Sequence, residues 1–192
     1  PNTAIDVMQG FNPWAHLRSV VFSLGERLLN WQTHLRAHQV ARRHYDIDPR
    51  VYAAMLDSRR IYSCAYWQQA ASLEQAQEHK LKLICEKLQL EPGQRLLDLG
   101  CGWGGFARYA AENYGVEVLG ITVSAQQQRY AQGLSLDLPV RTVLADYRTP
   151  LLRQEKPFDR IVSIGMMEHI GRLNDSLFFK IANDLLVDDG LM

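Results

Sequence analysis

A glycine-rich segment at residues 96–105 carries the clearest chemical signal in this sequence. It reads Leu-Leu-Asp-Leu-Gly-Cys-Gly-Trp-Gly-Gly. Glycines let a ligand approach the backbone closely, and a helix that begins directly after them offers free N–H groups to that ligand. The same glycines would also suit a tightly packed turn that binds nothing. Their position between an apolar run and a helix-like segment favours a nucleotide-type ligand.

Asp98 and the next apolar run distinguish two kinds of nucleotide ligand. Asp98 precedes the first glycine of the turn, where a carboxylate suits the ammonium and sulfonium groups of S-adenosylmethionine but repels a pyrophosphate. The run at 116–121 ends at Thr122-Val123-Ser124, where a dinucleotide-binding protein would carry an acidic residue for the ribose. The sequence therefore predicts S-adenosylmethionine binding and disfavours a dehydrogenase.

Short apolar runs alternate with helix-like segments around this turn. We expect strands at 95–99, 116–121, 140–144 and 158–164, with helices that begin near Gly104, Ser124 and Asn174. This alternation predicts an α/β fold with a doubly wound, mostly parallel sheet. Before the first strand, Ser72 and Gln75 form a capping signal for a helix that ends at Pro92-Gly93.

The N-terminal part of the chain has a different character. Apolar residues recur with helical spacing over 14–35 and predict a long amphipathic helix. Arginines are in excess in this region, so the helix either packs on the rest of the protein or lies on anionic lipid. The aromatic-rich stretch 44–69, which Asp48-Pro49 interrupts, is expected to be mostly loop.

The overall composition excludes several classes of protein. Lys+Arg and Asp+Glu both number 21, so nothing predicts a nucleic-acid partner. The three cysteines lack metal-ligand spacing, which predicts no metal site and a reducing, cytoplasmic location. Since no apolar run is long enough to cross a bilayer, any membrane contact is expected to be peripheral.

Motifs along the chain resemble those of cyclopropane-fatty-acid synthases and the related mycolic acid cyclopropane synthases. Segment 62–67 reads Tyr-Ser-Cys-Ala-Tyr-Trp, and the glycine turn, 120–127 and 165–171 follow it in the family's order. The first motif is the most specific, since ordinary small-molecule methyltransferases share only the glycine turn. The resemblance implies a Rossmann-like class I methyltransferase domain at 71–192, preceded at 1–70 by a helical extension and an active-site loop.

The resemblance also implies which residues bind S-adenosylmethionine. Thr122 and Ser124 would alternatively cap the following helix, and Asp146 would alternatively cap a turn. The implied cofactor-binding residues are Tyr62, Ser63, Asp98, Gly100, Cys101, Gly102, Trp103, Gly104, Thr122, Val123, Ser124, Gln127, Asp146 and Tyr147.

The implied reaction transfers a methyl group to the cis double bond of an unsaturated phospholipid acyl chain and closes a cyclopropane ring. The resemblance implies a bound bicarbonate as the base, held by Cys64 and Glu168, and a partner in the phospholipid bilayer surface at the inner face of the membrane. Cys64 would otherwise be a small buried hydrophobe and Glu168 a surface carboxylate. His169 is not placed in the catalytic set.

Two features depart from the family pattern. Residues 47–52 differ from it, so the opening for the acyl chain is expected to differ. We also expect the sheet to be truncated at its C-terminal side, because 188–190 reads as a turn into a fifth strand of which only Leu191 and Met192 are present. The fourth strand would then have an unpaired edge that invites a homodimer, and this chain alone is expected to be inactive.

Two other functions stay open: a small-molecule N-methyltransferase, or an inert module that binds cofactor or lipid.

Overall fold

The computed structural model describes residues 48–192, and the predicted helix at 14–35 lies outside them. The described elements run in this order: α4 (Pro49–Met55), α5 (Leu73–Lys87), β1 (Arg95–Leu99), α6 (Gly105–Tyr114), β2 (Glu117–Thr122), α7 (Ala125–Gly133), β3 (Val140–Leu144), the 3-10 helix η1 (Pro150–Gln154), β4 (Phe158–Val162), α8 (Met167–Ile170), the 3-10 helix η2 (Arg172–Asn174), α9 (Asp175–Leu185) and β5 (Leu186–Leu191).

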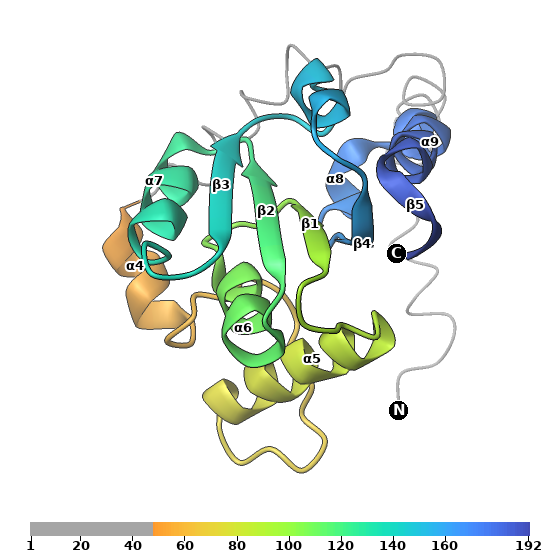
Figure 1. The fold of residues 1–192 in the computed structure, drawn as a ribbon. Helices are drawn as coiled ribbons and strands as arrows, with labels where there is room; N and C mark the ends of the chain where they lie inside the picture. The colour runs from red at the N-terminus through yellow and green to blue at the C-terminus, as the bar shows by residue number, and fades with distance from the viewer. Residues whose placement is uncertain (1–47) are drawn as a thin grey trace, which may run out of the picture.

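The strands form one parallel sheet in the order β3-β2-β1-β4-β5, from left to right in Figure 1. The chain starts at β1, moves outward to β2 and β3, and then returns to the other side of β1 to form β4 and β5. The order therefore reverses between β1 and β4, which confirms the predicted doubly wound sheet. Ligands of such sheets bind beyond the carboxyl ends of the strands at the point of reversal.

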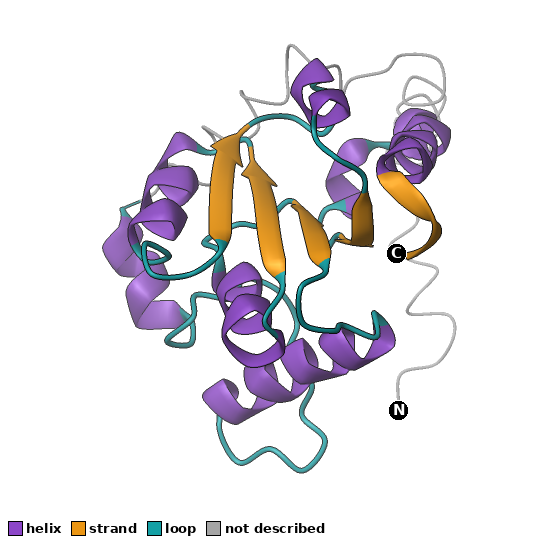
Figure 2. Ribbon diagram, in the orientation of Figure 1, coloured by secondary structure: helices purple, strands orange, loops and turns teal. Residues whose placement is uncertain are grey.

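Helices cover both faces of the sheet, as Figure 2 shows. Leu96 of β1 packs in an apolar cluster with Leu81 of α5 and Phe106 of α6. The next residue, Leu97, points to the opposite face and packs with Phe178 of α9. Because both faces are buried, the strands read as continuous apolar runs rather than alternating ones.

Side-chain caps set where two of the helices begin. The Ser72 hydroxyl accepts a 3.3 Å hydrogen bond from the Gln75 N–H, which confirms the predicted start of α5. Farther upstream, Asp48 caps α4 by accepting from the Arg50 N–H at 2.9 Å, and Pro49 occupies the first turn. The prediction that this stretch is mostly loop is wrong there, because Asp48-Pro49 begins a helix instead of breaking the chain.

The predicted turn at 188–190 is also wrong, because these residues lie within β5. Leu186 pairs with Phe158 and Leu191 with Arg160, and the register is irregular between the two pairs. This irregularity places the acidic residues Asp188 and Asp189 in solvent while apolar residues on either side still pair with β4. The edge of β4 that was expected to be unpaired is therefore covered within this chain.

Candidate functional site

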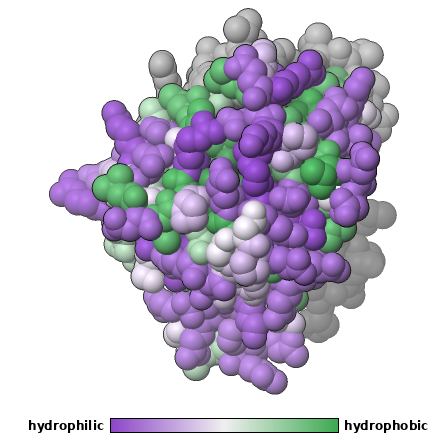
Figure 3. All heavy atoms as spheres, in the orientation of Figure 1, coloured by the Kyte–Doolittle hydropathy of each residue, from purple (hydrophilic) through white to green (hydrophobic). Residues whose placement is uncertain are grey.

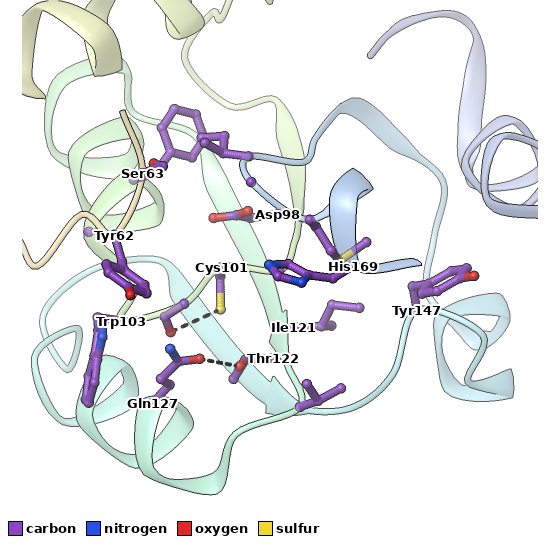
Figure 4. A pocket seen from close by; sticks show the side chains of 18 of the residues that line it. Tyr62, Ser63, Asp98, Cys101, Trp103, Ile121, Thr122, Gln127, Tyr147 and His169 are labelled. Carbon is purple, nitrogen blue, oxygen red and sulfur yellow. Dashed lines mark hydrogen bonds between the residues drawn. The ribbon is translucent and has the colours of Figure 1, made fainter. Parts of the chain in front are cut away.

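A pocket lies beyond the carboxyl ends of β1, β2, β3 and β4, where the strand order reverses. Figure 4 shows Asp98, Cys101, Gln127 and His169 around one space, with Trp103 and Tyr147 at opposite ends of it. Most of the predicted cofactor residues line this pocket: Tyr62, Ser63, Asp98, Gly100, Cys101, Gly102, Trp103, Thr122, Val123, Gln127, Asp146 and Tyr147. The pocket extends along the ends of these four strands, from Trp103 to Tyr147.

Asp98 is a buried carboxylate that forms no ion pair with the residues that the structure describes. Its residue is 2% exposed, and its Oδ2 atom has no hydrogen-bond partner among the described residues. Burial raises the pKa of Asp98 to about 7. A buried carboxylate is costly unless it is paired, so this position fits the ammonium group of a ligand. The chemistry of the pocket therefore agrees with the predicted S-adenosylmethionine site.

The glycines of the turn serve two different purposes. Gly100 and Gly102 have left-handed φ values of 92° and 53°, and both line the pocket. A Cβ atom at Gly102 would meet nothing within 4 Å, so its backbone is open to a ligand. Gly104 does not line the pocket, and a Cβ atom there would lie 2.7 Å from the Ala131 Cβ. Gly104 is therefore required where α6 packs on α7.

The end of β2 carries a small hydrogen-bonded network. The Thr122 hydroxyl donates to Gln127 Oε1 at 2.8 Å and accepts from the Ser124 N–H at 3.2 Å. Ser124 caps α7 by accepting from the Gln127 N–H at 3.3 Å, and it does not line the pocket. Because the amide oxygen of Gln127 accepts the hydrogen bond from Thr122, the amide nitrogen of Gln127 can donate to a ligand in the pocket.

The end of β3 is organised by an ion pair. Asp146 accepts from the Arg148 Nε at 2.7 Å and from the Arg148 N–H at 2.9 Å. Asp146 therefore caps a turn, which is the alternative role that the sequence left open for it. The neighbouring Tyr147 is buried with its ring edge against Phe178, 5.3 Å between centroids. Asp146 and Tyr147 thus form a fixed wall at this end of the pocket.

The segment 60–64 crosses the pocket from the side of α5, and we call it the strap. Tyr62 and Ser63 line the pocket, and the Gln77 amide holds the strap by donating to the Ser63 carbonyl at 3.0 Å. Cys64 is exposed and does not line the pocket, so its alternative role as a buried hydrophobe is wrong.

Glu168 is also exposed and lies in α8, outside the pocket lining. Its carboxylate nevertheless approaches the strap at Gly165, because a Cβ atom on Gly165 would lie 3.7 Å from both Glu168 Oε1 and Ser63 Cβ. The structure thus brings the Ser63-Cys64 segment and Glu168 to one glycine at the rim. Their catalytic roles stay predictions.

The pocket also contains residues that sequence reasoning did not select. His169 was left out of the catalytic set, yet its side chain lies in the pocket, as Figure 4 shows. Arg60 lines the pocket as well, with its guanidinium 4.0 Å from the Tyr130 ring centroid and 5.3 Å from that of Trp103. The position of Arg60 depends on a left-handed φ of 55°, which no local sequence signal announced.

Two further features concern the described residues, 48–192. Within that range no group of His, Cys, Asp and Glu side chains is arranged to hold a metal ion. The same range contains no helix that is both long and apolar enough to cross a membrane.

Comparisons with known proteins agree with this geometry. The family model of mycolic acid cyclopropane synthetase matches residues 32–192. The cyclopropane-fatty-acyl-phospholipid synthase of Escherichia coli strain K12 is 47% identical over 176 residues, which cover 92% of this chain and 45% of that protein. The chain therefore spans less than half the length of this relative.

Solved structures show the same fold. Mycolic acid cyclopropane synthase CmaA1, complexed with SAH (S-adenosylhomocysteine) and CTAB, is 38% identical with a TM-score of 0.75, over 80% of this chain and 55% of that one. Coclaurine N-methyltransferase, bound to N-methylheliamine and SAH, is 26% identical with a TM-score of 0.76, over 98% of this chain and 55% of that one. The sheet and its pocket are thus those of a Rossmann-like class I methyltransferase.

The Tyr-Ser-Cys-Ala-Tyr-Trp motif at 62–67, the glycine turn beside the buried Asp98, and the matches over most of the chain lead to one conclusion: this chain belongs to the mycolic acid cyclopropane synthetase family.

Proposed function

We propose that this chain forms the cofactor-binding part of an S-adenosylmethionine-dependent enzyme that converts a cis double bond of a phospholipid acyl chain into a cyclopropane ring. The observation that supports this cofactor is the buried Asp98 carboxylate near the end of β1, whose Oδ2 atom has no hydrogen-bond partner among the described residues. The choice of substrate is supported by the name of the Escherichia coli relative. Residues 71–192 would form the cofactor domain, and the strap would close over it.

The residues around the pocket suit the separate parts of the cofactor. Asp98 would pair with the ammonium group, and the methionine chain would lie along the backbone of Gly100 and Gly102, which lines the pocket. Thr122 and Gln127 at the end of β2 lie where ribose hydroxyls would bind, and Asp146 and Tyr147 would border the adenine. When bound, S-adenosylmethionine supplies an electrophilic methyl group on its sulfonium sulfur.

In the proposed reaction the π electrons of the alkene form a bond to that methyl carbon while the carbon–sulfur bond breaks, and the electron pair stays on sulfur. The resulting carbocation loses a proton from the transferred methyl group, and the electrons of that C–H bond close the ring. An alkene is a weak nucleophile and water would trap the cation, so the enzyme must exclude water and fix the alkene near the methyl group. The strap over the pocket is suited to that exclusion.

The proton acceptor is proposed to be a bicarbonate ion held near Cys64 and Glu168. Glu168 and Ser63 both lie close to Gly165, and Cys64 directly follows Ser63, so an anion held there would be next to the cofactor pocket. Neither residue lines the pocket directly. The proposal therefore places the base at the rim and leaves the glycine turn to the cofactor.

Contact with a bilayer surface is supported by large hydrophobic side chains that are exposed in the strap and close to it in the sequence. Tyr62, Tyr66 and Trp67 are 57%, 41% and 55% exposed, and Met55 of α4 is 51% exposed. Tyrosine and tryptophan are enriched where proteins meet the membrane–water interface. On the face shown in Figure 3, hydrophobic side chains occur in small groups among hydrophilic ones. We propose that the enzyme binds the inner face of the cytoplasmic membrane peripherally, through the region of the strap.

N-methylation of a small amine is a second candidate. It is favoured by the structural match to coclaurine N-methyltransferase, which extends over 98% of this chain. The strap motif and the higher identity to the phospholipid-modifying relative favour the first candidate.

The test supplies the purified full-length enzyme that contains this chain with isotopically labelled S-adenosylmethionine and vesicles of cis-unsaturated phosphatidylethanolamine, followed by mass analysis of the lipids. The proposed function predicts a labelled acyl chain that has gained one CH2 group and has lost its double bond. Vesicles with saturated acyl chains are the control and should stay unlabelled. Label on an added small amine, with none on lipid, would support the N-methyltransferase instead.

A further inference from the structure

Lys80 is a half-buried amine next to the pocket for which the proposed reaction provides no role. It lies on α5, on the side of the helix that faces the strap. Its Nζ atom donates a 2.8 Å hydrogen bond to the Ser63 hydroxyl. Burying an ammonium group is costly, and burial lowers the pKa of Lys80 to about 8. A lysine that served only to keep the protein soluble would be exposed and would not carry this cost of burial.

The strap is fixed to α5 by several polar contacts, of which Lys80 makes one. Gln77, one turn earlier on the helix, donates to the Ser63 carbonyl at 3.0 Å. Asp57, which is 4% exposed, closes the turn before the strap by accepting from the Ile61 N–H at 2.7 Å and the Arg59 N–H at 3.0 Å. Asp57 and Cys64 act against burial by raising the pKa of Lys80. The backbone of the strap is therefore held without any need for the Lys80 charge.

The contact between Lys80 and Ser63 determines which way the serine hydroxyl can donate. A protonated lysine has no acceptor, so Ser63 Oγ must accept and its own proton must point elsewhere. Ser63 lines the pocket, so the pocket is the place where that proton can find an acceptor. A cation that donates to the hydroxyl oxygen also polarises the O–H bond and makes it a stronger donor.

We propose that Lys80 is a positioning residue that acts through the Ser63 hydroxyl, which donates to a carboxylate-type anion bound in the pocket. This inference rests on the proposed function. Two anions share the required chemistry: the α-carboxylate of the cofactor and a carbonate species at the rim near Gly165. The positive charge of Lys80 offsets the negative charge of that anion in a region that already contains Asp98 and Glu168.

The effects of pH on binding and on stability should have opposite signs. Because the pKa of Lys80 is lowered in the folded state, its buried charge destabilises the protein below pH 8, and this cost disappears as the pH rises above that value. Anion binding should instead weaken above pH 8, when the charge is lost. A lysine that only stabilised the strap would not weaken binding while the fold gained stability.

The experiment measures binding by calorimetry for wild type and Lys80→Met with two ligands, each with and without bicarbonate. S-adenosylhomocysteine contains the α-carboxylate, and 5′-methylthioadenosine lacks it. Lys82→Met is the matched control, since Lys82 lies on the same helix with 64% of its side chain exposed and pairs only loosely with Glu86 at 3.7 Å. Lys80→Arg keeps the charge, and thermal melts check that each variant is folded.

If the anion is the cofactor carboxylate, Lys80→Met should bind S-adenosylhomocysteine about 10- to 100-fold more weakly and methylthioadenosine unchanged. If it is a carbonate species, bicarbonate should tighten binding in wild type and lose that effect in Lys80→Met. In either case Ser63→Ala should give the same loss, and the double variant should lose nothing more.

Equal weakening of both ligands in the absence of bicarbonate, or no change with either ligand whether or not bicarbonate is present, would overturn the inference. Should Lys80→Met fail to fold, the comparison of wild type with Lys80→Arg between pH 7 and pH 9 decides the matter, because only wild type should lose affinity near pH 8. Failure of the proposed function looks different, since wild type would then either not bind S-adenosylhomocysteine or give no labelled lipid in the vesicle assay.

Discussion

Asp98 of β1 pairs in register with Val162 of β4, across the point where the strand order of the sheet reverses. This places the only acidic residue of β1 at the centre of the sheet, 2% exposed and facing the pocket. A carboxylate so placed cannot be solvated by water from the surface, and its pKa rises to about 7 as a result. This arrangement can accommodate a cationic ligand.

Replacing Asp98 by Asn should weaken S-adenosylhomocysteine binding while stabilising the fold. Loss of a charged hydrogen-bond partner should reduce affinity roughly 10- to 100-fold, as calorimetry would measure. The pKa of Asp98 is raised, so its contribution to stability is fully present below pH 3.8 and is lost as the pH rises through about 7. Urea unfolding at pH 8 should therefore show Asp98→Asn to be more stable than wild type, by on the order of 1–4 kcal/mol.

Asp137→Asn is the control for that experiment, because Asp137 is exposed. It should leave both affinity and unfolding free energy nearly unchanged. An Asp98→Asn variant that bound S-adenosylhomocysteine as well as wild type would exclude an ammonium partner at this position.

Glu168→Gln and Cys64→Ala should lower turnover far more than cofactor affinity. Both residues are assigned to the rim that holds the base, and neither lines the pocket. Loss of one positioned acid/base contact commonly reduces the rate by on the order of 10² to 10⁴. Methyl transfer to lipid and calorimetric binding of S-adenosylhomocysteine would be measured on the same samples. The opposite pattern, with intact turnover and lost affinity, would move both residues into the cofactor site.

Gly104→Ala should destabilise the protein by about 1–3 kcal/mol. The substitution would place a side chain at a left-handed φ of 81° and bring its Cβ atom within 2.7 Å of the Ala131 Cβ. Gly133→Ala in α7 is the matched control, since a Cβ atom there meets nothing within 4 Å and its φ is ordinary. That control should be neutral or stabilise by up to about 1 kcal/mol. Equal effects of the two in urea unfolding would show that the contact between α6 and α7 is not tight.

Phe178→Ala should destabilise the protein by about 3–5 kcal/mol. Its ring is fully buried against Tyr147, so the substitution opens a cavity below one end of the pocket. The adjacent Phe179 is 54% exposed, and Phe179→Ala should cost less than about 1 kcal/mol. If both substitutions cost the same, α9 does not pack on the sheet through the face described above.

Much of the fold follows from patterns that act over a few residues. The glycine turn between β1 and α6 and the cap at Ser72 each depend on neighbours in the chain, so sequence alone located them. The continuous apolar runs also predicted the buried parallel strands, since both faces of such a sheet are covered. The position of Asp98 beside the turn was enough to predict a cationic ligand.

The tertiary structure decided what depends on residues that are distant in the chain. The sequence predicted a turn at 188–190, whereas β5 runs through these residues and pairs with β4 at Leu186 and Leu191 on either side of them, because the irregular register is set by contacts with another strand. Lys80 is likewise unremarkable on its helix, and only the fold brings it 2.8 Å from Ser63. Long-range packing also decided that His169 enters the pocket while Cys64 and Glu168 stay at its rim. Local sequence determines which conformations and chemistries are available, but burial and the distance between side chains depend on how the whole chain packs.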